Sequence, residues 1–232
     1  MQPTRVDQWI IQSLRFVQAK PFWVEAIETL SYSPFSNGLV YATPLFLLLE
    51  SSQGSRRGLV DRTILTILAA TVIGTLGSLL LRRWVRWPAP ASDPGLASVY
   101  APQFREYFRV HPNPNSFPSD SAMLYFTVVL GTYVLSHWLS TALLVWLMIF
   151  VAPAKIFVGG HYATDVLVGL LLGLLAYSLS AWLMTACLRP GTAFTHSGLL
   201  SLLEFCWLFE VGNELRDVRH IAGGFHRVRA LF

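Results

Sequence analysis

The sequence predicts an all-α fold, a polytopic membrane helix bundle of five to six spans with interfacial amphipathic helices at both ends. Of the 232 residues, 53% are hydrophobic and only 13% are charged, and the mean hydropathy is +0.49. Soluble domains carry about 25% charged residues on average, so this composition indicates an integral membrane protein. Several uninterrupted apolar segments, described next, supply the spans.

Five apolar segments are predicted to cross the bilayer, because they combine sufficient length with few charges. Pro34 and Pro44 interrupt the first segment, and residues 136–139 form a tight turn that makes the third and fourth antiparallel. The five segments are residues 33–49, 63–81, 121–135, 140–157 and 166–188.

Two further apolar segments, residues 6–30 and 197–211, are interrupted by charged residues and contain tryptophans. Such segments usually lie in the membrane interface, and the alternative is that one of them forms a sixth span. The chain is therefore divided into an N-terminal interfacial segment (1–32), a membrane helical core (33–188) and a C-terminal amphipathic tail (189–232).

A cation, a histidine and a carboxylate precede the last predicted span, at Lys155, His161 and Asp165. On a helix that begins near Gly160, His161 and Asp165 share one face. The carboxylate is expected to take the proton of one ring nitrogen and leave the other free as base, metal ligand or nucleophile. The alternatives are a His–Asp pair that only caps a helix, and a lysine that reaches from a helix end to the interface.

The long connection at residues 82–118 contains seven prolines and a short amphipathic piece around residues 104–109. Loops of this length are uncommon in compact domains and are often functional. Counting the ends of the spans puts Arg82, Ser119 and residues 155–165 on one face of the membrane. We therefore expect the topology to bring them together.

The distribution of basic residues favours one orientation of the bundle. Arg56, Arg57 and Arg62 form a dense cluster in a short loop on the face opposite the site. Short loops rich in lysine and arginine lie on the cytoplasmic side. The site is therefore expected on the non-cytoplasmic face of a multi-pass integral membrane protein.

These residues resemble the motifs of the type 2 phosphatidic acid phosphatase family, membrane lipid phosphatases related in fold to the vanadium haloperoxidases. The family motifs are Lys-x6-Arg-Pro, Pro-Ser-Gly-His and Ser-Arg-x5-His-x3-Asp, and their order recurs here between about residues 63 and 188. The third motif is present as Ala154-Lys155-x5-His161-x3-Asp165. The resemblance implies that His161 attacks phosphorus to form a phosphohistidine, that Asp165 orients it, and that Lys155 binds a phosphoryl oxygen.

The second motif is present as Pro118-Ser119-Asp120-Ser121. Ser119 matches the family's serine, which is implied to bind phosphate at a helix start, and the alternative is an ordinary N-cap. Asp120 replaces the glycine, as in members that resemble undecaprenyl diphosphate phosphatases. Ser121 stands where the family has the histidine that protonates the leaving group, and a serine hydroxyl is too weak an acid for that role.

The first motif is the most altered. When Pro90 is aligned with the family's proline, Arg82 falls on the lysine position and Ala89 on the arginine position. Arg82 can still clamp a phosphate with two donors, whereas Ala89 cannot bind one. Other basic side chains of the connection could replace the missing arginine or contact headgroups. These are Arg83, Arg86, Arg105, Arg109 and His111.

The sequence therefore predicts a divergent lipid phosphatase that hydrolyses a lipid phosphate or diphosphate through a phosphohistidine, with no metal or other cofactor. A lipid diphosphate is favoured because its leaving group is a weak base that needs no proton. The alternative is a catalytically impaired member that binds lipid phosphate or serves as a structural subunit of a membrane complex. The expected partners are membrane lipids and not nucleic acid. A transporter is not favoured, because no predicted span carries a buried charge within its apolar run.

Overall fold

The computed structural model describes residues 3–18, 20–32, 38–52, 55–110 and 115–187. All regular elements in these ranges are helices, which confirms the predicted all-α class. The amphipathic tail expected at residues 189–232 lies outside the described residues, as does His111.

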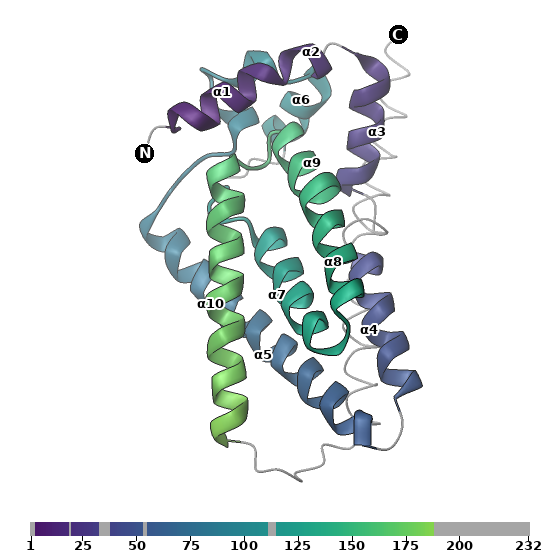
Figure 1. The fold of residues 1–232 in the computed structure, drawn as a ribbon. Coiled ribbons are helices and arrows are strands. Elements are labelled where there is room, and N and C mark those ends of the chain that lie inside the picture. Colours follow the sequence, from purple (N-terminus) through teal and green to yellow (C-terminus); the bar gives the residue numbers. More distant parts are fainter. Residues whose placement is uncertain (1–2, 19, 33–37, 53–54, 111–114, 188–232) are drawn as a thin grey trace.

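A bundle of long helices forms the body of the molecule (Figure 1). Three of them, α5 (Ser55–Trp84), α7 (Asp120–Leu135) and α10 (Ala163–Cys187), pack against one another. Helix α8 (His137–Trp146) continues through a π-helical turn, η4 (Leu147–Val151), into α9 (Ala152–Phe157).

The short connection between α7 and α8 consists of Ser136 alone. Its hydroxyl accepts a hydrogen bond from the Leu139 backbone N–H, so Ser136 caps the first turn of α8. The chain reverses at this point, and α8 returns alongside α7 as the sequence predicts.

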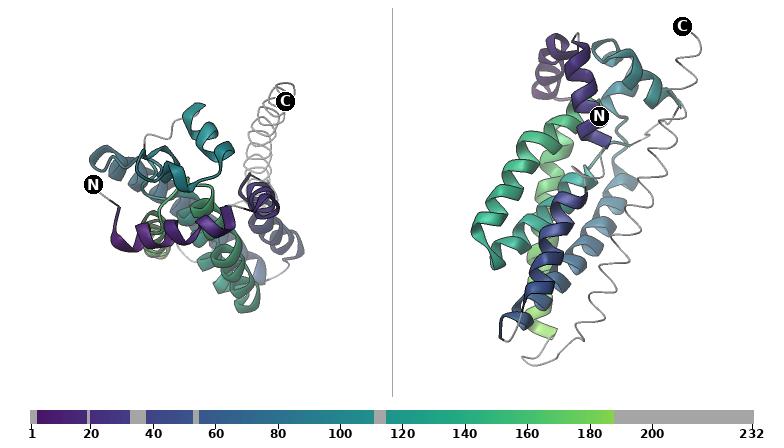
Figure 2. Two further views of the ribbon diagram at one scale, coloured as in Figure 1. Left: turned by 90° about the horizontal axis from the view of Figure 1, so that it is seen from above. Right: turned by 90° about the vertical axis from the view of Figure 1, so that its right-hand side faces the viewer.

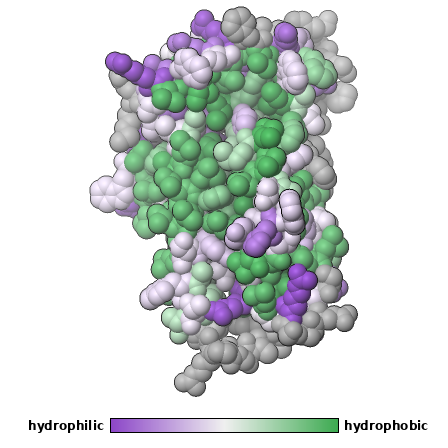
Figure 3. Space-filling view, in the orientation of Figure 1, coloured by the Kyte–Doolittle hydropathy of each residue, from purple (hydrophilic) through white to green (hydrophobic). Residues whose placement is uncertain are grey.

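Three helical segments are long and apolar enough to cross a membrane, namely Arg56–Trp84, His137–Phe157 and Ala163–Ala186. Two shorter apolar helices accompany them, α7 and α4 (Val40–Ser51). These helices overlap the five predicted spans, but α4 and α7 fall short of the usual spanning length, so the predicted number of spans stays a prediction. Figure 3 shows hydrophobic residues over most of the middle of one face, with most strongly hydrophilic residues toward its ends.

Helices α7 and α10 approach closely because α10 presents glycines to α7. A Cβ atom on Gly173 would lie 2.8 Å from the Met123 carbonyl oxygen, and one on Gly169 would collide with the Ser119 carbonyl oxygen. Side chains larger than hydrogen would separate the two helices. This contact fixes the beginning of α7 against the first turns of α10, where the predicted site lies.

The N-terminal helices α1 (Arg5–Ser13), α2 (Arg15–Gln18) and α3 (Pro21–Tyr32) lie at one end of the bundle. The view from above shows α1 crossing over that end (Figure 2). The Asp7 carboxylate of α1 is fully buried and accepts hydrogen bonds from the backbone N–H and the hydroxyl of Thr164, at 3.1 and 3.0 Å. Helix α1 is thereby bound to the first turn of α10.

The connection between α5 and α7 covers the same end of the bundle. It contains two short 3₁₀ turns, η2 (Pro90–Ser92) and η3 (Ala97–Val99), and the helix α6 (Pro102–Val110). Helix α6 confirms the predicted amphipathic piece, since Phe104 and Phe108 are buried while its basic residues are exposed. The buried side of this connection forms an apolar cluster with α1, α3 and the chain between α9 and α10.

Candidate functional site

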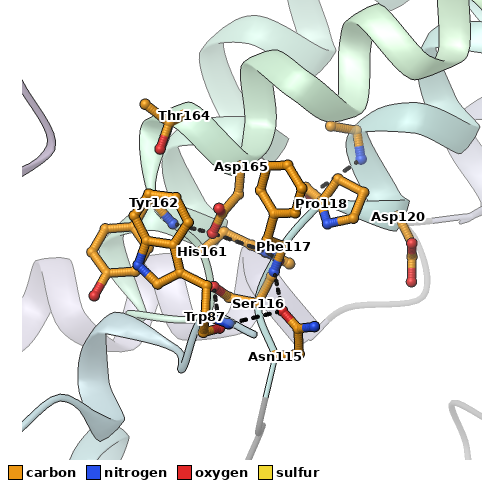
Figure 4. A network of polar contacts seen from close by, with 12 residues as sticks. Trp87, Asn115, Ser116, Phe117, Pro118, Asp120, His161, Tyr162, Thr164 and Asp165 are labelled. Atoms are coloured by element: carbon orange, nitrogen blue, oxygen red, sulfur yellow. Dashed lines mark hydrogen bonds and ion pairs between the residues drawn. The ribbon is translucent and has the colours of Figure 1, made fainter. Parts of the chain in front are cut away.

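His161 lies in the short connection between α9 and α10, two residues before α10 begins. The sequence analysis placed the start of this helix near Gly160, and that boundary is wrong by three residues. The imidazole Nδ1 lies 2.7 Å from the carbonyl oxygen of Ser116 (Figure 4). A carbonyl can only accept, so Nδ1 carries the proton and Nε2 holds the free lone pair.

Asp165 lies directly behind the imidazole, in the first turn of α10. Its Oδ2 is 3.9 Å from His161 Nδ1, which is too long for a hydrogen bond. The same oxygen accepts a hydrogen bond from the Tyr162 backbone N–H at 2.8 Å, and the side chain is fully buried. The expected carboxylate–imidazole hydrogen bond is therefore absent, and the Ser116 carbonyl takes its place.

Burial lowers the pKa of His161 to about 4. The side chain is only 14% exposed, and a charged imidazolium would lose most of its hydration there. The Ser116 carbonyl and Asp120 oppose this effect, whereas Lys155 and Arg82 reinforce it. His161 is consequently a neutral imidazole at physiological pH, and a neutral imidazole is the nucleophilic form.

Ser119 forms the N-cap of α7 beside the first turn of α10. Its hydroxyl accepts a hydrogen bond from the Ala122 backbone N–H at 3.5 Å, and its own N–H donates to the Asp165 carbonyl at 3.1 Å. The residue is 1% exposed. In this conformation Ser119 acts as a cap, and it ties the start of α7 to the segment that carries His161.

Arg82, in the last turn of α5, forms an ion pair with Asp120. The same guanidinium nitrogen donates to the Pro118 carbonyl at 3.3 Å, and the other carboxylate oxygen of Asp120 accepts from the Ser78 hydroxyl. The predicted phosphate clamp is thus already bound to an acidic side chain of the protein. The sequence analysis noted Asp120 only as the replacement of a glycine.

Lys155 lies near the end of α9 and donates from Nζ to the Ser31 carbonyl of α3, at 2.9 Å. It acts electrostatically on the His161 imidazole, so its charge is close to the candidate nucleophile. The contact with Ser31 joins the N-terminal helices to the site, an arrangement that the sequence did not predict.

The two altered motif positions differ in their surroundings. Ala89 is fully buried in the apolar cluster together with Trp87 and Tyr162, whose rings lie 5.1 Å apart. An arginine at position 89 would place a charged side chain in this apolar cluster. Ser121 is half-buried in the first turn of α7, immediately after Asp120.

The other arginines of the connection are exposed. Arg109 pairs with Glu106 of the same helix, at 2.6 Å. Arg83, Arg86 and Arg105 are exposed. Within the described ranges, no three His, Cys, Asp or Glu side chains are placed to hold a metal ion.

Asn115 and Ser116 support the site and were missed by the sequence analysis. The Asn115 amide donates to the Arg82 and Val85 carbonyls, at 3.1 and 2.6 Å, and its oxygen accepts from the Trp87 N–H at 3.2 Å. The bond to Arg82 satisfies a carbonyl in the last turn of α5, and the bond to Val85 satisfies the carbonyl just after it. Asn115 could have been found, because an asparagine in a proline-rich loop indicates a turn. The contact between the Ser116 carbonyl and His161 could not, because a backbone carbonyl does not depend on the side chain.

Comparisons with known proteins identify the family of this chain. The family model described as PAP2 superfamily matches residues 63–189, more than half of the chain. No curated protein and no solved structure matches the chain. The matched region contains α5, α7, α9 and α10, whose ends meet around His161, and the chain belongs to the PAP2 superfamily.

Proposed function

We propose that this protein is a multi-pass integral membrane lipid phosphatase that uses His161 as its nucleophile. The observation that supports this most directly is the state of the imidazole. Burial keeps it neutral, the Ser116 carbonyl holds the proton on Nδ1, and Nε2 remains available for attack. An imidazole whose tautomer and orientation are fixed by a partner is the usual arrangement of a histidine nucleophile or base.

In the proposed reaction, the Nε2 lone pair forms a bond to the terminal phosphorus of a lipid diphosphate. The bond from that phosphorus to the bridging oxygen breaks, and the lipid monophosphate leaves with the electron pair. Water then attacks the phosphohistidine, which releases inorganic phosphate and restores the imidazole. One proton of this water stays on the phosphate, and the other passes to solvent.

A lipid diphosphate suits this site better than phosphatidic acid. Its leaving group is a phosphate monoester, which departs without a proton, whereas phosphatidic acid must expel an alkoxide. Ser121 stands at the position of the family's general acid, and the loss of such an acid typically costs about a hundred- to ten-thousand-fold in rate. That loss falls mainly on substrates whose leaving group must be protonated.

The test is phosphate release by the purified protein in detergent or liposomes, with a prenyl diphosphate and with phosphatidic acid. We expect faster release from the diphosphate, and a loss of at least about a hundredfold in His161→Ala. His137→Ala is the matched control, because His137 is an exposed histidine at the opposite end of the bundle. Equal rates in wild type and His161→Ala, or faster release from phosphatidic acid, would contradict the proposal.

A second candidate function is the binding of lipid phosphate without turnover, or a structural role in a membrane complex. The ion pair between Arg82 and Asp120 favours it, together with the burial of Ala89 where the family has an arginine. A His161→Ala variant that folds and supports the cellular role as well as wild type would favour this candidate.

A further inference from the structure

The ion pair between Arg82 of α5 and Asp120 of α7 engages the guanidinium that the sequence predicts to bind phosphate. Arg82 is the last-turn residue of α5 that faces the site, and its charge acts on the His161 imidazole. Asp120 is the first residue of α7, and its carboxylate meets the Arg82 guanidinium. The carboxylate is placed where an incoming phosphoryl oxygen would contact the same donor.

The structure fixes Asp120 in this position from two sides. One carboxylate oxygen pairs with Arg82, and the other accepts from the hydroxyl of Ser78, a buried residue one turn earlier on α5. Asp120 also stands at the N-terminus of α7, where a negative charge is favourable. The carboxylate is therefore oriented before any ligand arrives.

We propose that Asp120 competes with substrate phosphate for the Arg82 guanidinium and thereby sets the affinity of the site for lipid phosphates. This inference rests on the proposed phosphate site, although it requires binding and not turnover. A competing group inside the protein lowers the affinity for every anion by the same factor. Weakly held anions then fail to occupy the site at the concentrations present in a membrane.

The consequence concerns the lipids that surround the protein. Arg82 lies at the end of a candidate span, at the depth where phosphodiester headgroups gather. A free guanidinium there would bind these abundant headgroups. With Asp120 in place, every anion must displace a carboxylate, so only a ligand with further contacts, such as a diphosphate that also reaches Lys155, keeps enough affinity to occupy the site.

The test measures the dissociation constant of inorganic phosphate for the full-length protein in detergent, in wild type and Asp120→Asn. The amide keeps the shape of the carboxylate and removes its charge, so we expect phosphate to bind roughly five- to tenfold more tightly. Asp120→Glu restores a carboxylate within reach of Arg82 and should keep the weak affinity of wild type. Ser78→Ala, which loosens only one side of Asp120, should give a smaller gain than Asp120→Asn.

Two controls separate this effect from a change in net charge. Glu106→Gln removes one carboxylate from the exposed Glu106–Arg109 pair, and it should leave phosphate affinity unchanged. In an Arg82→Ala background, Asp120→Asn should give no gain, because the contested donor is gone. An unchanged affinity in Asp120→Asn, or a gain that persists without Arg82, would overturn the inference.

The experiments distinguish an error in the proposed phosphatase function from an error in the proposed competition by Asp120. If His161→Ala turns over substrate as fast as wild type while Asp120→Asn tightens phosphate binding, the enzyme proposal is wrong and the competition is retained. If His161→Ala is inactive while Asp120→Asn binds phosphate as weakly as wild type, only the competition is wrong.

Discussion

The reactivity proposed for His161 follows from two features of its surroundings. Burial removes the hydration that an imidazolium needs, and the Ser116 carbonyl fixes the proton on Nδ1. The Asp165 carboxylate stands 3.9 Å away and is turned toward the Tyr162 N–H. Asp165 therefore shapes the loop that presents the imidazole, and after phosphoryl transfer its negative charge lies close to the positively charged ring.

The lowered pKa of His161 predicts an unusual pH dependence. Protonation of the imidazole removes the nucleophile, so the acid limb that His161 contributes should be centred near its pKa of about 4, and not near the ordinary value of 6.5. When phosphate release is measured from pH 4 to 8, protonation of His161 alone should leave the rate nearly constant above about pH 5.5. An acid limb of kcat/KM centred near 6.5 that is also present in Asp165→Asn, and so does not arise from the neighbouring carboxyl, would contradict the prediction.

Side-chain patterns in the sequence predicted the residues around the candidate site, but they did not predict the backbone contacts between them. His161, Asp165, Ser119, Arg82 and Lys155 come from four different helices or their ends, and the structure brings these ends together. The Ser116 carbonyl could not be predicted, because any residue carries one. The partner of Arg82 could have been suspected, since Asp120 introduces an acid next to a predicted phosphate ligand.

At the level of elements, the contact between α7 and α10 holds the site together. Ser119 caps α7 and donates to the Asp165 carbonyl, and this bond requires the close approach that Gly169 and Gly173 allow. Separation of the two helices would move His161 away from the Ser116 carbonyl, since Ser116 leads directly into α7. The glycines of α10 are thus positioning residues for the proposed nucleophile.

Gly169→Ala should therefore destabilise the protein and reduce phosphate release. The new methyl group would collide with the Ser119 carbonyl, and overpacking of this kind typically costs about 1–3 kcal/mol. Thermal unfolding in detergent and the rate of phosphate release measure the two effects. Gly58→Ala is the matched control, because nothing lies within 4 Å of its new methyl group and α5 should gain up to about 1 kcal/mol. Equal stability of the two variants would contradict this account.

Helix α1 is attached to α10 through a buried carboxylate. Asp7 accepts from Thr164 and also from Thr4, with which it forms a capping box. The sequence analysis placed residues 6–30 in the membrane interface, and that placement stays a prediction. The polar pattern of this segment did not reveal that the Asp7 side chain is buried whereas Trp9 is 69% exposed.

Asp7→Ala should leave the Thr164 N–H and hydroxyl without their acceptor. Loss of a partner by a buried polar group typically costs about 1–3 kcal/mol, and it should loosen α1 first. Limited proteolysis should release the N-terminal segment from Asp7→Ala sooner than from wild type. Thr29→Ala is the control, since its exposed hydroxyl bonds only within α3. Equal cleavage rates in the two variants would show that Asp7 does not hold α1 in place.

Element boundaries were predicted where composition changes sharply and missed where capping decides them. The turn at Ser136 and the end of α9 at Phe157 agree with the expected positions within a few residues. Helix α10 begins at Ala163 because Tyr162 and the preceding loop fold over the Asp165 carboxylate. That bond joins residues three apart in the sequence, as in one half of a capping box, and apolar periodicity does not register this local signal.

On the scale of the whole molecule, the two ends of the bundle differ in structure. One end carries α1, α6, the connection and the candidate site, whereas the other carries the start of α5 with its arginine cluster (Figure 1). On the face drawn in Figure 3, mostly hydrophobic residues lie between the two ends. Membrane insertion in this manner would place the site and the cluster on opposite sides, and the positive-inside rule predicts that the cluster lies in the cytoplasm.

Cysteine labelling tests this orientation in intact cells. With Cys187 and Cys206 replaced by serine, Ser98→Cys presents an exposed thiol at the site end, and Gly58→Cys presents one at the opposite end without removing an arginine. A membrane-impermeant maleimide should label Ser98→Cys in intact cells and Gly58→Cys only after the membrane is opened. The reverse pattern would put the site in the cytoplasm, and labelling of both in intact cells would mean that no apolar band separates the ends.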